Sequence, residues 1–122
     1  MHIAEIGTGT RRRAPLPDGP IAEALTSADT SDRLAVVHVE LPAGGSMLEH
    51  DHGASEIVLI PLSGTVELCQ EGKNRTLSAG STAHIATGER VSLNNPGAEP
   101  ASLIVVASPP EFAGRLASWP VV

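Results

Sequence analysis

The stretch EHDHGASE, residues 49–56, contains the side chains of this chain that are best suited to bind a metal ion. His50 and His52 are two residues apart, and on a β-strand such residues point to the same face because side chains alternate. Glu56 follows Gly53, where the chain can bend and bring a carboxylate back toward the imidazoles. Two imidazoles and one carboxylate form a facial set for Fe, Mn, Ni or Zn that leaves coordination positions open. The alternative is a solvated acidic turn that happens to contain histidine.

The segments around this stretch are expected to be short β-strands. Residues 33–41 alternate so that Val37, Val39 and Leu41 share one face, and Pro42 ends the run. Residues 55–77 indicate three strands joined by tight turns, and 101–110 form an apolar run typical of a strand buried in a sandwich. Short extended segments lie between them. At least six strands at short spacing predict an all-β sandwich or barrel.

Three parts of one domain are expected along the chain. Residues 1–33 form an N-terminal arm and leading strand or strands, and residues 34–110 form the barrel. Residues 111–122 form a C-terminal helix or tail, with Phe112, Leu116 and Trp119 at helical spacing. Because 122 residues suit a single core, no second domain is expected.

Composition excludes several classes of partner. A net charge of −6 argues against a nucleic-acid surface, which needs a basic face. No apolar run approaches the roughly 20 residues that span a bilayer, so no membrane partner is expected. One cysteine, Cys69, and an N-terminus without the order of a secretory signal predict a cytoplasmic protein. Aromatic residues make up only 2%, so a pocket here would be lined by Val, Leu, Ile and Ala.

Taken together, these motifs resemble those of a small single-domain cupin. The first cupin motif is matched by Gly44, by His50 and His52 after five intervening residues, and by Glu56. The second is outlined by GSTAHIATGERVSLNNPG, residues 80–97. The resemblance covers residues 34–110 and implies a double-stranded β-helix, or jelly-roll barrel. It also implies a divalent metal ion held inside the barrel by His50, His52 and Glu56.

The chain departs from the cupin pattern at two ligand positions. Val91 stands where the family places its fourth ligand, and a valine cannot bind metal. Counting from His52 gives Glu56 as the carboxylate ligand, whereas counting back from Gly64 gives Ile57. A one-residue bulge near Pro61 would reconcile the two counts. His84 could replace the missing ligand, but alternation favours an outward orientation for it.

Two functions of different class follow. One is a metal-dependent enzyme on a small molecule, a dioxygenase or an isomerase or lyase, because fold alone does not choose the chemistry. The alternative is a non-catalytic, metal-free cupin that binds a small ligand. The resemblance also implies a homodimer, with the N-terminal arm and residues 101–107 as contact surface.

Overall fold

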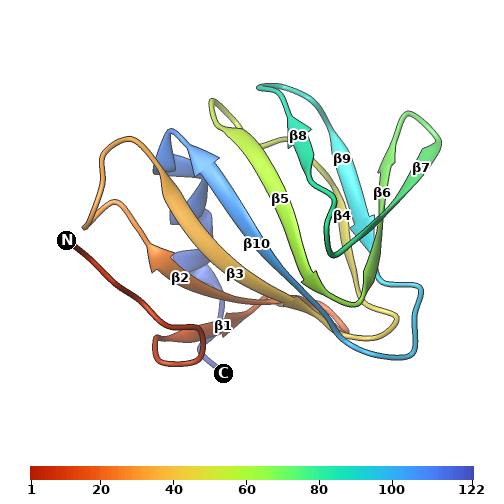
Figure 1. The fold of residues 1–122 in the computed structure, drawn as a ribbon, viewed down its shortest axis with the longest axis horizontal. Coiled ribbons are helices and arrows are strands. Elements are labelled where there is room, and N and C mark those ends of the chain that lie inside the picture. The colour runs from red at the N-terminus through yellow and green to blue at the C-terminus, as the bar shows by residue number, and fades with distance from the viewer.

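The computed structural model describes residues 1–122 and consists of two antiparallel β-sheets followed by one short helix (Figure 1). The six-stranded sheet has the order β1 (Arg11–Arg13), β2 (Ile21–Thr26), β3 (Ala35–Leu41), β10 (Ala101–Ser108), β5 (Glu56–Ser63) and β8 (Ala83–Ile85). The four-stranded sheet has the order β4 (Ser46–His50), β9 (Val91–Asn94), β6 (Thr65–Gln70) and β7 (Lys73–Ser78). A 3-10 helix, η1 (Pro110–Ser118), ends the chain. The predicted all-β jelly roll with a short C-terminal helix is confirmed.

The core lies between the two sheets and follows the alternation of the strands. On β3, Val37, Val39 and Leu41 are buried, as predicted, and they belong to a cluster of 15 buried apolar residues. β10 is central, paired with β3 and β5, but only its odd-numbered residues are buried. Its even-numbered residues, among them Ile104 and Val106, lie half-buried on the outer face. The apolar run therefore forms a strand of the sandwich, as predicted. Only one face of the strand is covered by the core.

The predicted bulge occurs in β5 beside Pro61. In the pairing with β10, Pro61 lies opposite Leu103 and Ser63 lies opposite Ser102. Leu62 is left without a partner, and its side chain is exposed. Leu62 is therefore the one extra residue between Glu56 and Gly64, and it explains why the count from His52 and the count back from Gly64 differ by one.

Asn95 joins the turns that precede β4 and follow β9. Its side chain is 2% exposed, and its Nδ2 donates hydrogen bonds to Leu41 O at 3.1 Å and Glu99 O at 2.8 Å. Its Oδ1 accepts a hydrogen bond from Gly97 N at 3.0 Å. The Asn95 backbone N–H also donates to Gly45 O. One buried amide therefore holds the two motif turns together.

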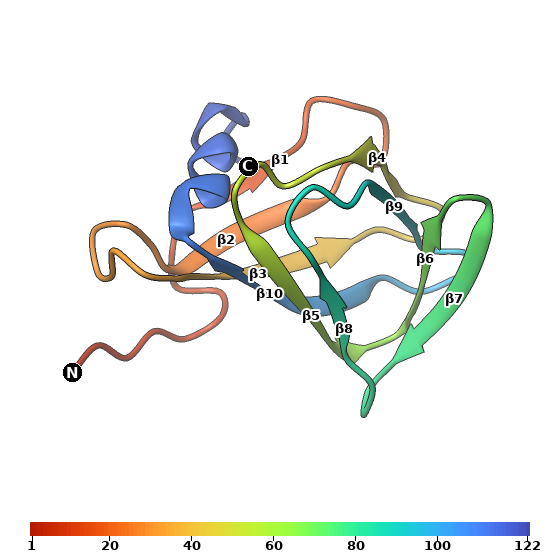
Figure 2. The same cartoon turned by 90° about the horizontal axis from the view of Figure 1, so that it is seen from above.

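The last residues of the chain pair with β1 beside the barrel. Arg13 N donates to Pro120 O, Val122 N donates to Arg11 O, and a β-bridge joins Arg12 to Val121. Figure 2 shows η1 and the loop before β2 on the same side of the molecule as β4. The 3-10 helix is therefore held against the side of the barrel on which β4 ends. No helix is long and apolar enough to cross a membrane.

Candidate functional site

His50 and His52 lie together on the wall of an apolar cavity. His50 is the last residue of β4, and His52 follows it in the turn that leads to β5. Their ring centroids are 4.6 Å apart, with the ring planes inclined at 68°. The cavity has a volume of about 280 Å³, and of its 21 lining residues only His50, His52 and Arg115 carry titratable side chains. Residues of β3, β5, β9 and β10 and apolar residues of η1 supply most of the remaining wall.

His52 is a buried imidazole with an unsatisfied nitrogen. The residue is 5% exposed, and its Nδ1 is enclosed with no hydrogen-bond partner. Burial, with smaller contributions from His50 and Arg115, lowers the pKa of His52 from 6.5 to about 4. His52 is therefore neutral at pH 7.

His50 is held in one orientation by the backbone of its own strand. Its Nδ1 lies 2.7 Å from Leu48 O, and a carbonyl oxygen only accepts hydrogen bonds. Nδ1 therefore carries the hydrogen, and in the neutral ring Nε2 carries the lone pair. No protein group hydrogen-bonds to Nε2 of His50 or of His52.

η1 packs against the two histidines and the turn that carries them. The ring of Phe112 is edge-on to His52 at 4.7 Å and stacked with His50 at 6.5 Å between centroids. The guanidinium of Arg115 lies 5.3 Å from the Phe112 centroid, and its NH1 donates to Asp51 O at 3.0 Å. The apolar spacing of residues 112–119 indicated a helix, but nothing in the sequence connected that helix with the two histidines.

Glu56 does not join the two histidines. Ser55 is buried, and its Oγ donates to Pro109 O, so the next residue, Glu56, points outward and Ile57 points inward. On the outer face, Glu56 Oε1 lies 2.9 Å from His84 Nε2, and both side chains are more than half exposed. No group of three or more His, Cys, Asp or Glu side chains in the chain is arranged to hold a metal ion. The expected set of His50, His52 and Glu56 is therefore not assembled.

Val91 occupies the fourth cupin ligand position, and Ile57 takes the inward-facing place beside Glu56. Ile57 is fully buried, and Val91 lies opposite His50 in the β4–β9 pair with 3% of its surface exposed. Neither side chain can donate electrons to a metal ion. The residues present therefore supply two imidazoles on the cavity wall and not the set of His50, His52 and Glu56 that the resemblance implied. His84, on the outer face, does not replace the missing ligand.

Two arginines surround the turn that carries the histidines. Arg90 lies 3.5 Å from Glu49 and 3.3 Å from Asp51, and Arg115 lies 3.8 Å from the same Asp51 carboxylate. A hydrogen bond from Gly53 N, together with these two cations, holds the pKa of Asp51 below its usual value. Glu49 and Asp51 thus connect the turn to Arg90, directly before β9, and to Arg115 of η1.

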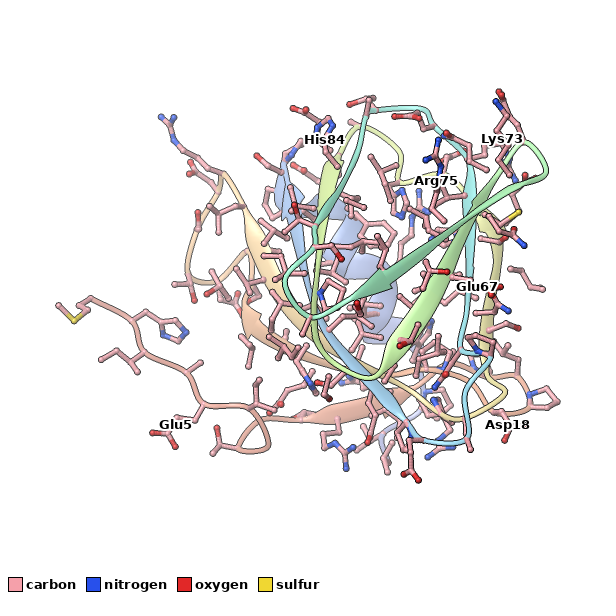
Figure 3. The ribbon with its side chains drawn as sticks, turned by 45° about the vertical axis from the view of Figure 1, so that its right-hand side comes forward. Glu5, Asp18, Glu67, Lys73, Arg75 and His84 are labelled. Atoms are coloured by element: carbon pink, nitrogen blue, oxygen red, sulfur yellow. The ribbon has the colours of Figure 1, made fainter.

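A second, polar hollow of about 240 Å³ opens between the β6–β7 hairpin and the segment from β8 to β9. Figure 3 shows Lys73, Arg75 and His84 at the same end of the molecule, around this hollow. Glu71 and Glu89 also line it, so its carboxylates balance its two permanent cations. Glu89 accepts hydrogen bonds from Gln70 Nε2 and Ala86 N, which lower its pKa. With no net charge to select a ligand, this hollow is a weaker candidate than the apolar cavity.

Comparison with known proteins gives one family and one fold. The sequence model of the family described as "Cupin domain" matches residues 37–107. A predicted oxalate decarboxylase from Thermotoga maritima is 21% identical, with a TM-score of 0.76 over 87% of this chain and 97% of the other. The polyketide cyclase RemF from Streptomyces resistomycificus is 20% identical, with a TM-score of 0.78 over 88% of this chain and 79% of the other. A sugar phosphate isomerase from Silicibacter pomeroyi is 21% identical, with a TM-score of 0.75 over 86% of this chain and 74% of the other.

These likenesses establish the fold and not the reaction. The three proteins are named for three different activities, one of them predicted, on one architecture, and each is less than 25% identical to this chain. No curated protein matches the chain.

Proposed function

This chain belongs to the cupin family, and we propose that its function is to bind a small, largely apolar molecule inside the barrel, with His50 and His52 as the polar contacts. In this proposal, binding does not use the family's four-ligand metal centre. Val91 stands at the fourth ligand position, Glu56 is on the outer face, and Ile57 faces the barrel interior in its place.

The buried His52 is the observation that carries the proposal. An imidazole with no hydrogen-bond partner inside an apolar cavity costs folding free energy, about 1–3 kcal/mol for an unsatisfied polar group. Leucine or methionine would fill the same space without that cost. A bound molecule cannot reach the enclosed Nδ1 of His52. One that forms hydrogen bonds with Nε2 of His50 and Nε2 of His52 offsets part of the cost of keeping two polar rings on an apolar cavity wall, which gives a physical reason for histidine here.

The cavity suits a molecule of moderate size. An apolar cavity of ~150 Å³ is enough to bind benzene. A volume of about 280 Å³ therefore accommodates a ligand with more than the six carbons of benzene, and the aliphatic walls favour a compact hydrocarbon body. A small-molecule site is usually a mostly apolar pocket with a few polar groups.

A divalent ion on His50 and His52, with a bound substrate completing its coordination, is the second candidate. The observation that favours it is that Nε2 of both rings has no protein partner. In this case Fe, Mn, Ni or Zn would supply Lewis-acid or oxygen chemistry, and the protein would be an enzyme. Glu56 has no place in this set, because it points away from the histidines.

Metal content per chain separates the two candidates. We expect elemental analysis of untagged protein, incubated with Fe, Mn, Ni or Zn and then desalted, to find far less than one ion per chain. A matched variant, Ile57→Glu with Val91→His, restores the missing ligand types and serves as the positive control if it folds. One ion per chain in the wild type, lost in His50→Ala with His52→Ala, would contradict the proposal and favour the enzyme.

We also propose that the protein forms a homodimer through the outer face of the six-stranded sheet. Val36, Val58 and Val106 lie side by side there, next to the adjacent row of Ile60 and Ile104. These side chains remain half-buried in the single chain. The N-terminal arm adds three exposed apolar side chains, Met1, Ile3 and Ile6. Apolar surface of this kind supports an isologous contact between two copies.

A further inference from the structure

We infer that His50 and His52 present opposite hydrogen-bonding roles to the cavity, His50 as acceptor and His52 as donor, so that the pocket selects an apolar molecule carrying a neutral hydroxyl group. This inference rests on the proposed ligand-binding function and adds the polar group of the ligand to it.

The role of His50 follows from its bond to Leu48. Because Leu48 O can only accept, the hydrogen of the neutral His50 ring is on Nδ1. Nε2 then carries a lone pair, and no backbone or side-chain group of the protein donates a hydrogen bond to it. His50 therefore offers the cavity an acceptor.

The role of His52 follows from the enclosure of its other nitrogen. A hydrogen on Nδ1 would bury a donor that has no acceptor, whereas a hydrogen on Nε2 leaves only a lone pair unpaired at Nδ1. Orphaned N–H groups are rarer in protein interiors than acceptors with unused capacity. Nε2 of His52 therefore carries the hydrogen, and it is the nitrogen that is not enclosed by protein atoms. His52 offers the cavity a donor.

A hydroxyl group complements this pair. One hydroxyl donates one hydrogen bond and accepts another, and the two rings are adjacent, with centroids 4.6 Å apart. A carboxylate only accepts, so one of its oxygens would face the lone pair of His50. Arg115, the one cation on the wall, already donates to Asp51 O and lies beside the Asp51 carboxylate. Asp51 therefore already compensates part of the charge of this cation, which leaves less of it for a carboxylate ligand.

Nitrogen NMR of the protein without ligand tests the assignment directly. We expect long-range ¹H–¹⁵N spectra at pH 7 to show His50 with its hydrogen on Nδ1 and His52 with its hydrogen on Nε2. The signals are assigned with the single variants His50→Phe and His52→Phe. A hydrogen on Nδ1 of His52, or on Nε2 of His50, would overturn the inference.

Binding of matched probes tests the ligand class. We expect 4-tert-butylcyclohexanol to bind at least about tenfold more tightly than 4-tert-butylcyclohexanecarboxylate, since the carboxylate leaves the His50 lone pair unpaired. Titration calorimetry measures both. His50→Phe should weaken alcohol binding by about fivefold, the usual size of one neutral hydrogen bond, while His84→Phe on the outer face should not change it.

The outcomes separate the inference from the proposed function. Tighter binding of the carboxylate would overturn the inference and leave ligand binding intact. Failure of both probes and of the bare hydrocarbon core to bind would count against ligand binding, while the nitrogen spectra would still decide the two tautomers.

Discussion

At the scale of the residue, the main feature of this protein is a pair of histidines in different environments. His50 has its Nδ1 satisfied by its own strand, whereas His52 is buried with Nδ1 unpaired. The carboxylate of Asp51, between the two histidines, forms ion pairs with Arg90 and with Arg115 on the cavity wall. The three residues His50, Asp51 and His52 therefore supply both the polar groups of the pocket and a carboxylate that binds the arginines at its edge.

His52 should make stability depend on pH. Because burial lowers its pKa to about 4, the unfolded chain binds more protons than the folded one between about pH 4 and 6.5. Stability is therefore highest above pH 6.5 with respect to this group, and it falls by roughly 2–3 kcal/mol toward pH 4. Urea unfolding at several pH values measures the change.

The variant His52→Leu should flatten this dependence, and His84→Leu should leave it in place, because His84 is exposed on the outer face. An unchanged slope in His52→Leu would show that other groups cause the acid sensitivity.

At the scale of the element, the site depends on how turns join the strands. The turn after β4 buries Ser55, which determines that Glu56 points out and Ile57 points in. Asn95 holds the turns beyond β3 and β9 together, and Glu23 on β2 anchors the N-terminal arm. These polar groups position the strands whose apolar side chains form the cavity.

Replacing Asn95 should weaken the whole barrel. Asn95→Ala leaves Leu41 O, Glu99 O and Gly97 N without their side-chain partner, which we expect to lower the free energy of unfolding by about 2–3 kcal/mol. Urea unfolding measures this loss. Asn94→Ala, at the half-buried end of β9, is the matched control and should change stability far less. Equal losses in both variants would contradict the role given to Asn95.

Replacing Glu23 should release the N-terminal arm. Burial disfavours the charged Glu23 carboxylate, but hydrogen bonds from Gly7 N and Gly9 N outweigh burial and lower its pKa. The stabilisation is therefore present above the unfolded pKa near 4.5 and is lost as the pH falls through the lower folded value.

We expect Glu23→Gln to increase hydrogen exchange at the Gly7 and Gly9 amides at pH 7, because an amide cannot accept both bonds as a carboxylate does. Glu67→Gln on β6 is the control. Unchanged exchange at both glycines would show that the arm is held by other contacts.

At the scale of the whole molecule, the two sheets differ in their outer surfaces. The outer face of β3, β10 and β5 carries a continuous group of β-branched side chains, while β7 is almost wholly exposed and polar. The N-terminal arm extends away from the body of the protein with its apolar side chains exposed (Figure 1). This asymmetry is the basis of the proposed dimer.

A charge on the outer face should break the dimer. We expect Val106→Lys to shift the wild-type dimer to a monomer in sedimentation experiments, because Val106 lies opposite Val36 and Val58 in the middle of the patch. Thr76→Lys adds the same charge to exposed β7 of the other sheet and should leave the dimer unchanged. A wild-type monomer at all concentrations would contradict the proposal.

The sequence by itself determined the features that depend on neighbouring residues. Alternation assigned Val37, Val39 and Leu41 to the core, and motif spacing indicated a cupin barrel with a bulge near Pro61. The spacing of His50 and His52 was also sufficient to place both on one cavity. Such patterns survive in the folded chain because the period of a strand is a local property of the backbone.

Only the tertiary structure decided which side chains meet across the barrel. The orientation of Glu56 depends on the turn that buries Ser55, and that turn is held by Pro109 from the end of the chain. The packing of Phe112 against the histidines likewise depends on where η1 docks. These contacts join residues about 50 or more positions apart. Their geometry depends on strand pairing and core packing, which cannot be inferred from the pattern of neighbouring residues.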